Sequence, residues 1–159
     1  MSVQLPTLFL PHGAPDLATS THPARVFLAS LAATLPGPIR GIVIVSAHWQ
    51  ATSPSITANA APRTIHDFSG WGAELEKLVY AAHTDVNLID AVESAMVAAD
   101  IRLKRDTKQG FDHGAWVPLL LAWPDAKLPV VQLSLVNDWD IIHHVALGRA
   151  LEPLTHDGY

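Results

Sequence analysis

Cysteine is absent from this chain of 159 residues, and charged residues are scarce. Without cysteine there is no disulfide framework and no thiolate metal site, so a transition metal would have to bind imidazole and carboxylate groups. Asp, Glu, Lys and Arg together make up only 16% of the chain, and the net charge of −5 comes without any basic run. We therefore expect neither nucleic acid nor an anionic membrane surface as a partner.

Long apolar runs are missing as well. No stretch approaches the length of a membrane span, and the N-terminus lacks the basic start of a signal peptide, which together predict a cytoplasmic protein. The chain does contain 49% hydrophobic residues, enough for the core of one globular domain over residues 1–159. It also has nine histidines against ten lysines and arginines, and histidine is the commonest metal ligand.

The most informative stretch is an apolar run that leads directly to a histidine. Residues 41–45 (GIVIV) predict a buried strand of a parallel sheet. We expect this strand to stop before Ser46 and to present His48 and Trp49 at its carboxyl end. Ligands of open α/β sheets bind in the crevice outside the carboxyl ends of the strands, so His48 is a candidate site residue.

A second strand–histidine pair precedes the first. Residues 5–10 (LPTLFL) predict a strand, and His12 follows it in a tight turn. Helical spacing over residues 23–35 then suggests a strand–helix–strand unit that would make the two strands neighbours. We therefore expect the imidazole nitrogens of His12 and His48 to lie within about 3–4 Å of each other, as a shared metal ion requires.

The remaining pattern alternates strands and helices. It predicts an α/β fold with a mostly parallel sheet flanked by helices. The expected strands cover residues 55–57, 101–103 and 129–135, and the expected helices cover residues 73–82, 87–99, 117–123 and 138–154, the last of them capped by Asp138.

Two polar motifs add further candidates. The loop over residues 60–72 carries His66 and Asp67, and it either walls a pocket or only provides a helix cap. In residues 109–116 (QGFDHGAW), two glycines bracket an Asp–His pair that contains His113, directly before a very apolar helix. An imidazole has an ordinary pKa near neutrality, so a histidine at such a place is suited to accept and return a proton.

Five motifs in this chain resemble the successive motifs of the 4,5-DOPA extradiol dioxygenase family, which belongs to the class III extradiol ring-cleaving dioxygenases. They are HGAP at 12–15, SAHW at 46–49, TIHDF at 64–68, GFDHG at 110–114 and VVQLS at 130–134. The resemblance implies a metal-dependent, extradiol cleavage of a catechol-type ring by dioxygen, with Fe²⁺ or Zn²⁺ as the cofactor.

The same resemblance implies roles for individual residues. His12 and His48 match the first two metal ligands, and His113 matches the histidine that lines the substrate pocket, which we take as the catalytic group. Residues His66, Asp67 and Trp49 are the implied substrate contacts.

Members of that family are considerably longer than 159 residues. The resemblance therefore implies that this sequence corresponds to the N-terminal part of a larger single-domain fold, with the third metal ligand and an acid–base histidine in the other part. We expect such a chain to bind metal weakly and to lack ring cleavage when isolated as a monomer. An open sheet edge would then be covered by the rest of a longer protein or by self-association.

Two other functions remain open at the level of the sequence. The same superfamily contains Memo-like proteins, which keep the fold in a binding or signalling role without catalysis. A zinc hydrolase built on His12 and His48 is the other alternative. Consumption of dioxygen in the presence of a catechol and Fe²⁺ separates the dioxygenase from both.

Overall fold

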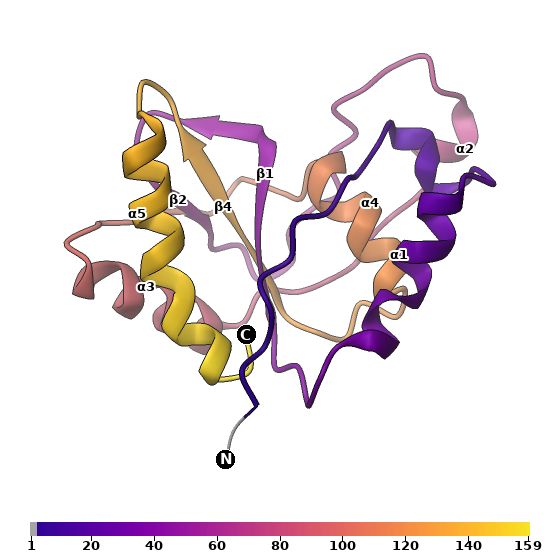
Figure 1. Ribbon diagram of the computed structural model, residues 1–159. Helices are drawn as coiled ribbons and strands as arrows, with labels where there is room; N and C mark the ends of the chain where they lie inside the picture. The colour runs from indigo at the N-terminus through magenta and orange to yellow at the C-terminus, as the bar shows by residue number, and fades with distance from the viewer. Residues whose placement is uncertain (1–2) are drawn as a thin grey trace.

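The computed structural model describes residues 3–159, in which helices and strands alternate around one sheet (Figure 1). In chain order the elements are the 3-10 helix η1 (Pro15–Ala18), α1 (Pro23–Thr34), β1 (Ile42–Ala51), β2 (Ser55–Thr57), α2 (Ala73–Glu76), α3 (Val86–Ala98), β3 (Lys104–Asp106), α4 (His113–Ala122), β4 (Val130–Val136), α5 (Ile141–Leu151) and the 3-10 helix η2 (Glu152–His156). No helix within residues 3–159 combines the length and the apolar character that a membrane crossing requires.

The sheet has the strand order β1-β4-β2-β3 and is mostly parallel. β1 pairs with β4 in parallel, β2 pairs with β3 in parallel, and β2 meets β4 in the antiparallel sense through Ile56 and Leu133. The predicted fold class, an α/β fold with a mostly parallel sheet flanked by helices, is confirmed.

Helices cover both faces of the sheet, α1 and α4 on one side and α3 and α5 on the other (Figure 1). The neighbouring residues Val130 and Val131 of β4 show this directly, because each is fully buried and they belong to different core clusters. Both faces of β4 are largely shielded from water, so its sequence does not alternate between apolar and polar residues but is mostly apolar (VVQLSLV).

The structure corrects the expected course of β1. The strand was predicted to stop before Ser46, but it continues to Ala51. Its pairing with β4 shifts register between Val45 and Gln50, so the residues in between are displaced from the regular ladder. A bulge of this kind bends a strand and re-aims its side chains, and periodicity alone does not reveal it.

The predicted strand at Leu5–Leu10 is wrong. This segment has no strand assignment, and its backbone contact with the rest of the chain is the hydrogen bond from Leu5 N–H to the Thr155 carbonyl, 2.9 Å. An apolar sequence becomes a strand only when a partner satisfies its backbone groups. The expected strand–helix–strand unit around α1 is therefore not formed within residues 3–159.

Other boundaries differ by several residues. The helix expected over 73–82 is the short α2, the strand expected over 101–103 is β3 at 104–106, and the helix expected from 117 already begins at His113 as α4. The last helix begins at Ile141, because the Asp140 side chain and not that of Asp138 caps it. Asp138 has a positive φ of 64°, which a helix cannot accommodate.

The buried Tyr80 supplies a prediction about alkaline stability. Burial, followed by the neighbouring Asp125 carboxylate, raises the pKa of Tyr80 from 10.0 to about 12. Between these two values the unfolded chain loses the phenolic proton while the folded chain keeps it, so folding should weaken as the pH rises through this window. We expect a loss on the order of 1 kcal/mol that is absent in Tyr80→Phe, measured by urea unfolding at pH 9 to 12. Tyr159→Phe, which leaves Tyr80 in place, should behave as the wild type.

Candidate metal centre

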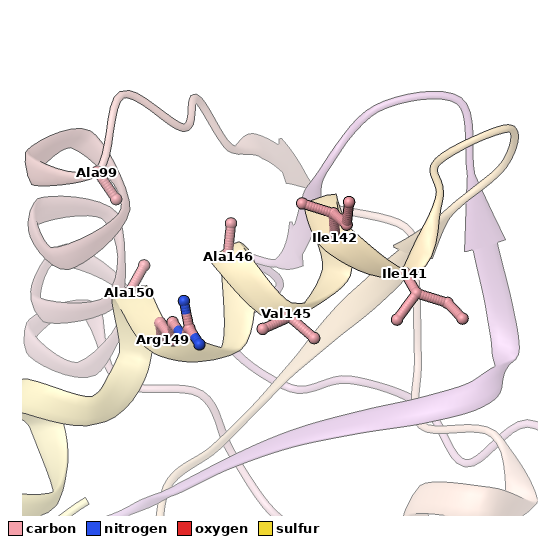
Figure 2. Close-up of a pocket in the computed structure, with 7 residues that line it drawn as sticks. All are labelled: Ala99, Ile141, Ile142, Val145, Ala146, Arg149 and Ala150. Carbon is pink, nitrogen blue, oxygen red and sulfur yellow. The ribbon is translucent and has the colours of Figure 1, made fainter.

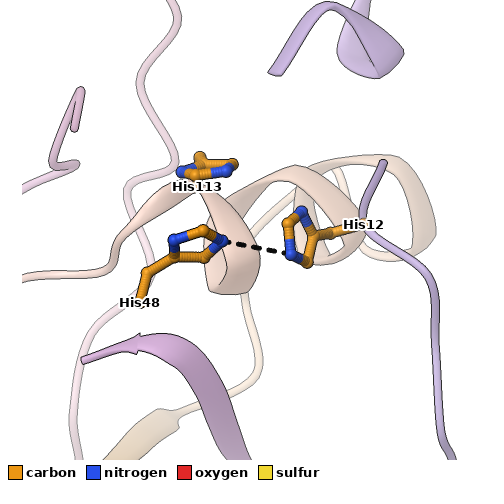
Figure 3. Close-up of side chains that lie close together, drawn as sticks. All are labelled: His12, His48 and His113. Atoms are coloured by element: carbon orange, nitrogen blue, oxygen red, sulfur yellow. Dashed lines mark hydrogen bonds between the residues drawn. The ribbon is translucent and has the colours of Figure 1, made fainter. Parts of the chain in front are cut away.

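Three imidazoles from distant parts of the sequence converge at one point (Figure 3). His12 comes from the turn that follows the extended N-terminal segment, His48 from the bulged part of β1, and His113 from the first position of α4. One ring nitrogen from each lies within 4.8 Å of the others, and Nε2 of His12 is 3.2 Å from Nε2 of His48. The structure thus brings His12 and His48 together at the distance that the sequence predicts for ligands of one ion.

The geometry of the pair suits a divalent transition metal. The Nε2 atoms of His12 and His48 are 3.2 Å apart, a separation that two metal–nitrogen bonds of about 2.1 Å would span. The other ring nitrogen of His12, Nδ1, is buried and has no hydrogen-bond partner among residues 3–159. Burial, followed by the proximity of His113 and His48, lowers the pKa of His12 below its ordinary 6.5. A neutral imidazole is the form that binds a metal, so these residues fit the ion that the sequence motifs imply.

Asp67 lies behind the histidines and orients one of them. Its Oδ1 accepts hydrogen bonds from Nδ1 of His113 (2.8 Å) and from the His113 backbone N–H (3.1 Å). Its Oδ2 is 4.0 Å from Nδ1 of His48. Burial alone would raise the pKa of Asp67, but the hydrogen bonds from His113 outweigh this effect and lower it. The ionised carboxylate therefore holds the proton of His113 on Nδ1 and leaves its Nε2 with a free lone pair.

A buried carboxylate joins the elements that carry the site. Asp112, only 2% exposed, accepts hydrogen bonds from the Ser46 hydroxyl of β1 and from the Gln132 amide of β4, each at 2.5 Å. It also caps α4 through the Ala115 N–H. The Ser46 hydroxyl oxygen in turn accepts the His48 backbone N–H at 3.2 Å. One carboxylate thereby sets the position of β1 relative to the first turn of α4, and with it His48 relative to His113.

The sequence singled out neither Ser46 nor Gln132 as site residues. A glutamine inside the otherwise apolar run of β4 is the signal that could have identified one of them, because a buried polar side chain needs a buried partner. Nothing in the spacing identifies that partner as Asp112, which lies on another element.

The two remaining candidates, His66 and Trp49, are not members of the three-histidine group. His66 donates a hydrogen bond from Nε2 to the Leu78 carbonyl, 3.0 Å away, and its ring lies near those of Phe68 and Trp116. Trp49 is only 7% exposed and so offers little surface to a ligand. Asp67, expected at the edge of the pocket, contacts His113 directly.

Gly114 makes the close approach of α4 to β1 feasible. A Cβ at this position would overlap the Ser46 hydroxyl and would lie 2.9 Å from Cδ2 of His48. We expect Gly114→Ala to push β1 away from α4, to cost about 1–3 kcal/mol of folding free energy, and to weaken metal binding at the same time. Gly148→Ala in α5 is the matched control, because nothing lies within 4 Å of its added Cβ and alanine favours a helix by about 1 kcal/mol. Thermal unfolding and metal titration of both variants test this difference, and equal metal affinity in the two would contradict the packing argument.

Comparison with known proteins identifies the class to which this fold and site belong. Residues 16–158 match the family described as the catalytic LigB subunit of aromatic ring-opening dioxygenase. The chain belongs to this LigB family. His48, Asp67 and His113 lie inside the matched region, whereas His12 lies just before it.

Individual relatives agree with this assignment. The chain is 36% identical to a 4,5-DOPA dioxygenase extradiol of Beta vulgaris over 155 residues, which cover 96% of this chain and 58% of that protein. It is 35% identical to a 4,5-DOPA dioxygenase extradiol of Escherichia coli (strain K12) over 157 residues, which cover 99% of this chain and 57% of that protein. A crystal structure of an uncharacterized protein from Escherichia coli K12 is similar with a TM-score of 0.69 and 31% identity, over 86% of this chain and 50% of that one. The chain spans a little more than half the length of the curated relatives it matches.

Proposed function

We propose that this protein takes part in the opening of a catechol-type aromatic ring by dioxygen, at a divalent metal, Fe²⁺ or Zn²⁺, held by His12 and His48. The observation that carries the proposal is the convergence of three imidazoles within 4.8 Å, in a chain of the LigB family. The names of the curated relatives, 4,5-DOPA dioxygenase extradiol, support a catechol as the substrate class.

A bound metal supplies a Lewis-acid centre that favours ionisation of the catechol oxygens and gives dioxygen a place to react. The protein's part is to hold that centre with two neutral imidazoles and to leave positions beside it open. The lowered pKa of His12 serves this purpose, since it keeps the ring unprotonated near neutral pH. Imidazole suits iron and zinc alike, so the donor set supports both ions.

His113 is the proposed proton carrier. Because Asp67 keeps a proton on Nδ1 of His113, the Nε2 atom of the same ring is able to accept a proton from a catechol hydroxyl and to return it later. The His113 and His48 ring centroids are 4.0 Å apart, so this acceptor lies beside the proposed metal position. The arrangement of carboxylate, imidazole and reacting hydroxyl follows the logic of an oriented general base.

The test compares the purified chain with a longer LigB-family polypeptide that contains it, each loaded anaerobically with Fe²⁺ and then mixed with L-DOPA or unsubstituted catechol under isotopically labelled dioxygen. We expect no uptake of dioxygen by the isolated monomeric chain. We expect the longer polypeptide to take up dioxygen in step with the loss of catechol, with both labelled atoms in the product by mass spectrometry. A longer polypeptide that binds the metal and the catechol but consumes no dioxygen would contradict the proposed reaction and favour a non-catalytic role. Metal-dependent ester hydrolysis in place of oxygen uptake would favour the zinc hydrolase.

Substitution of His113 separates its role from metal binding. In the longer polypeptide we expect His113→Ala to retain the metal and to lower ring opening by about 10²–10⁴-fold, the usual contribution of a positioned acid–base group. His83→Ala, which alters an exposed histidine outside the three-histidine group, is the control. Loss of the metal together with the activity would make His113 a ligand and not a proton carrier.

A further inference from the structure

The imidazole of His144 joins the end of β4 to the beginning of α5. Its Nε2 accepts a hydrogen bond from the Val136 backbone N–H (3.1 Å), and its Nδ1 donates one to the Asp140 carbonyl (3.0 Å). A backbone N–H only donates and a backbone carbonyl only accepts, so these partners fix the ring in its neutral form with the proton on Nδ1. A protonated ring would carry a second hydrogen on Nε2 and would direct it at the N–H of Val136.

The amide that would lose its acceptor is buried. Val136, the last residue of β4, is only 4% exposed, and a buried N–H without a partner is unfavourable. The N–H of the next residue, Asn137, donates to the carbonyl of Ala51 at the end of β1, 2.8 Å away. His144 therefore fastens the turn that follows the carboxyl ends of β1 and β4.

The first turn of α5 has few other contacts that hold it. Ile141 and Ile142 are 81% and 76% exposed, and the first buried residue of this helix is Leu147. Figure 2 shows both isoleucines at the start of the helix, beside a hollow of about 550 Å³ that α5 lines together with Ala99 at the end of α3. Segments with few buried contacts open locally at a low cost in free energy. The hydrogen bonds of His144 are thus a large part of what holds this turn closed.

The charged groups around His144 leave its two hydrogen bonds unchanged. Asp138 lies in the turn, Asp140 and His143 lie at the N-terminus of α5, and β4 has no titratable residue. The Asp140 carboxylate is engaged by His143, whose Nδ1 and backbone N–H are 2.7 and 3.0 Å from its Oδ1. The N-terminus of a helix also disfavours a positive charge. α3 packs on α5 and has two acidic residues, which both pair with one guanidinium of β3: Asp90 and Glu93 with Arg105.

We propose that His144 is a pH-sensitive latch, which holds the turn over residues 136–140 closed when its imidazole is neutral and releases the turn when the imidazole is protonated. The closed form accommodates only the neutral ring, whereas the open form accepts the proton, so the open form gains population as the pH falls. An imidazole ordinarily takes up its proton around pH 6.5, which places the response close to neutral pH. The proposal depends neither on a metal nor on a reaction.

The test measures amide hydrogen exchange of Val136 by NMR at about pH 7.5 and about pH 5.5, corrected for the intrinsic pH dependence of exchange. We expect the protection of this amide to fall about tenfold, because one pH unit below the ordinary imidazole value raises the open population by about that factor. The amide of Gln132, which donates to the Thr57 hydroxyl at 2.8 Å in the middle of β4, is the internal control and should keep its protection. The ring nitrogen shifts of His144 at the higher pH should show the proton on Nδ1.

Substitutions separate His144 from its neighbour. His144→Gln provides an amide oxygen that can accept from Val136 without titrating, so the protection should persist and should not change with pH. His144→Ala removes the acceptor, so the protection should be low at both pH values. His143→Gln is the matched control, because it removes the adjacent titratable ring and should keep the tenfold step.

Three results would overturn the proposal. In the first, the protection of Val136 is the same at both pH values. In the second, His144→Gln retains the pH-dependent step or His143→Gln abolishes it, which would assign the step to another group. In the third, Gln132 loses protection to the same extent as Val136, which would mean that the whole sheet opens and not one turn.

Discussion

Replacing His48 with alanine is expected to weaken binding of a divalent metal by at least about 100-fold. Substituting a residue that only hydrogen-bonds to a metal ligand already lowers metal affinity by about 10–100-fold. His48 is itself one of the two proposed ligands, whose nitrogens are 3.2 Å apart, so its loss should cost at least as much. Its side chain is exposed, so the substitution should leave the fold intact. The measurement is calorimetric titration of the metal-free protein with Zn²⁺ or, anaerobically, with Fe²⁺. His12→Ala should have an effect of the same size.

Thermal unfolding provides an independent readout of the same prediction. A metal at 100 times its dissociation constant stabilises the folded state by about 2.7 kcal/mol. This stabilisation should be present in the wild type and in His83→Ala, and absent in His48→Ala. Metal-dependent stabilisation that survives in both His12→Ala and His48→Ala would place the ion elsewhere. If His113→Ala loses it as well, three imidazoles hold the metal.

Replacing Asp112 with alanine is expected to lower the free energy of unfolding by about 3–5 kcal/mol. The substitution leaves the buried Ser46 hydroxyl and the Gln132 amide without their acceptor, and each such group costs about 1–3 kcal/mol. The loss of the α4 cap adds about 1 kcal/mol. Because the same carboxylate ties β1 to α4, metal affinity should fall together with stability. Urea unfolding and metal titration measure the two effects.

Two further variants show whether the buried network or the cap is responsible. Asp140→Ala removes an exposed aspartate cap from α5 and should cost only about 1 kcal/mol. Asp112→Asn should cost about 1–2 kcal/mol, because the amide oxygen can still accept from Ser46 and Gln132 can turn its otherwise unpartnered Oε1 toward the new amide. Equal costs for Asp112→Ala and Asp140→Ala would show that the network contributes nothing beyond capping.

Local patterns in the sequence were sufficient to predict most of the fold. The apolar run at 130–135 forms most of the largely buried strand β4. The run at 42–45, which was predicted as a buried strand, does form a strand, but β1 is partly exposed at the end of the sheet. Amphipathic spacing indicated α1 and α3 to within one residue at either end. The motifs around His12, His48 and His113 also indicated the family. These features depend on side-chain type and on short-range spacing, which a sequence displays directly.

The tertiary structure alone decided how the site is assembled. The bulge in β1 that aims His48, the carboxylate of Asp67 behind His113 and the link from Asp112 to Ser46 each join residues on different elements. Leu5–Leu10 is a further example, because it has the composition of a strand but forms none, since no strand within residues 3–159 pairs with it. Strand pairing and buried hydrogen bonds are relations between distant segments, so the sequence of this protein determined which residues were available and the packing determined which of them meet.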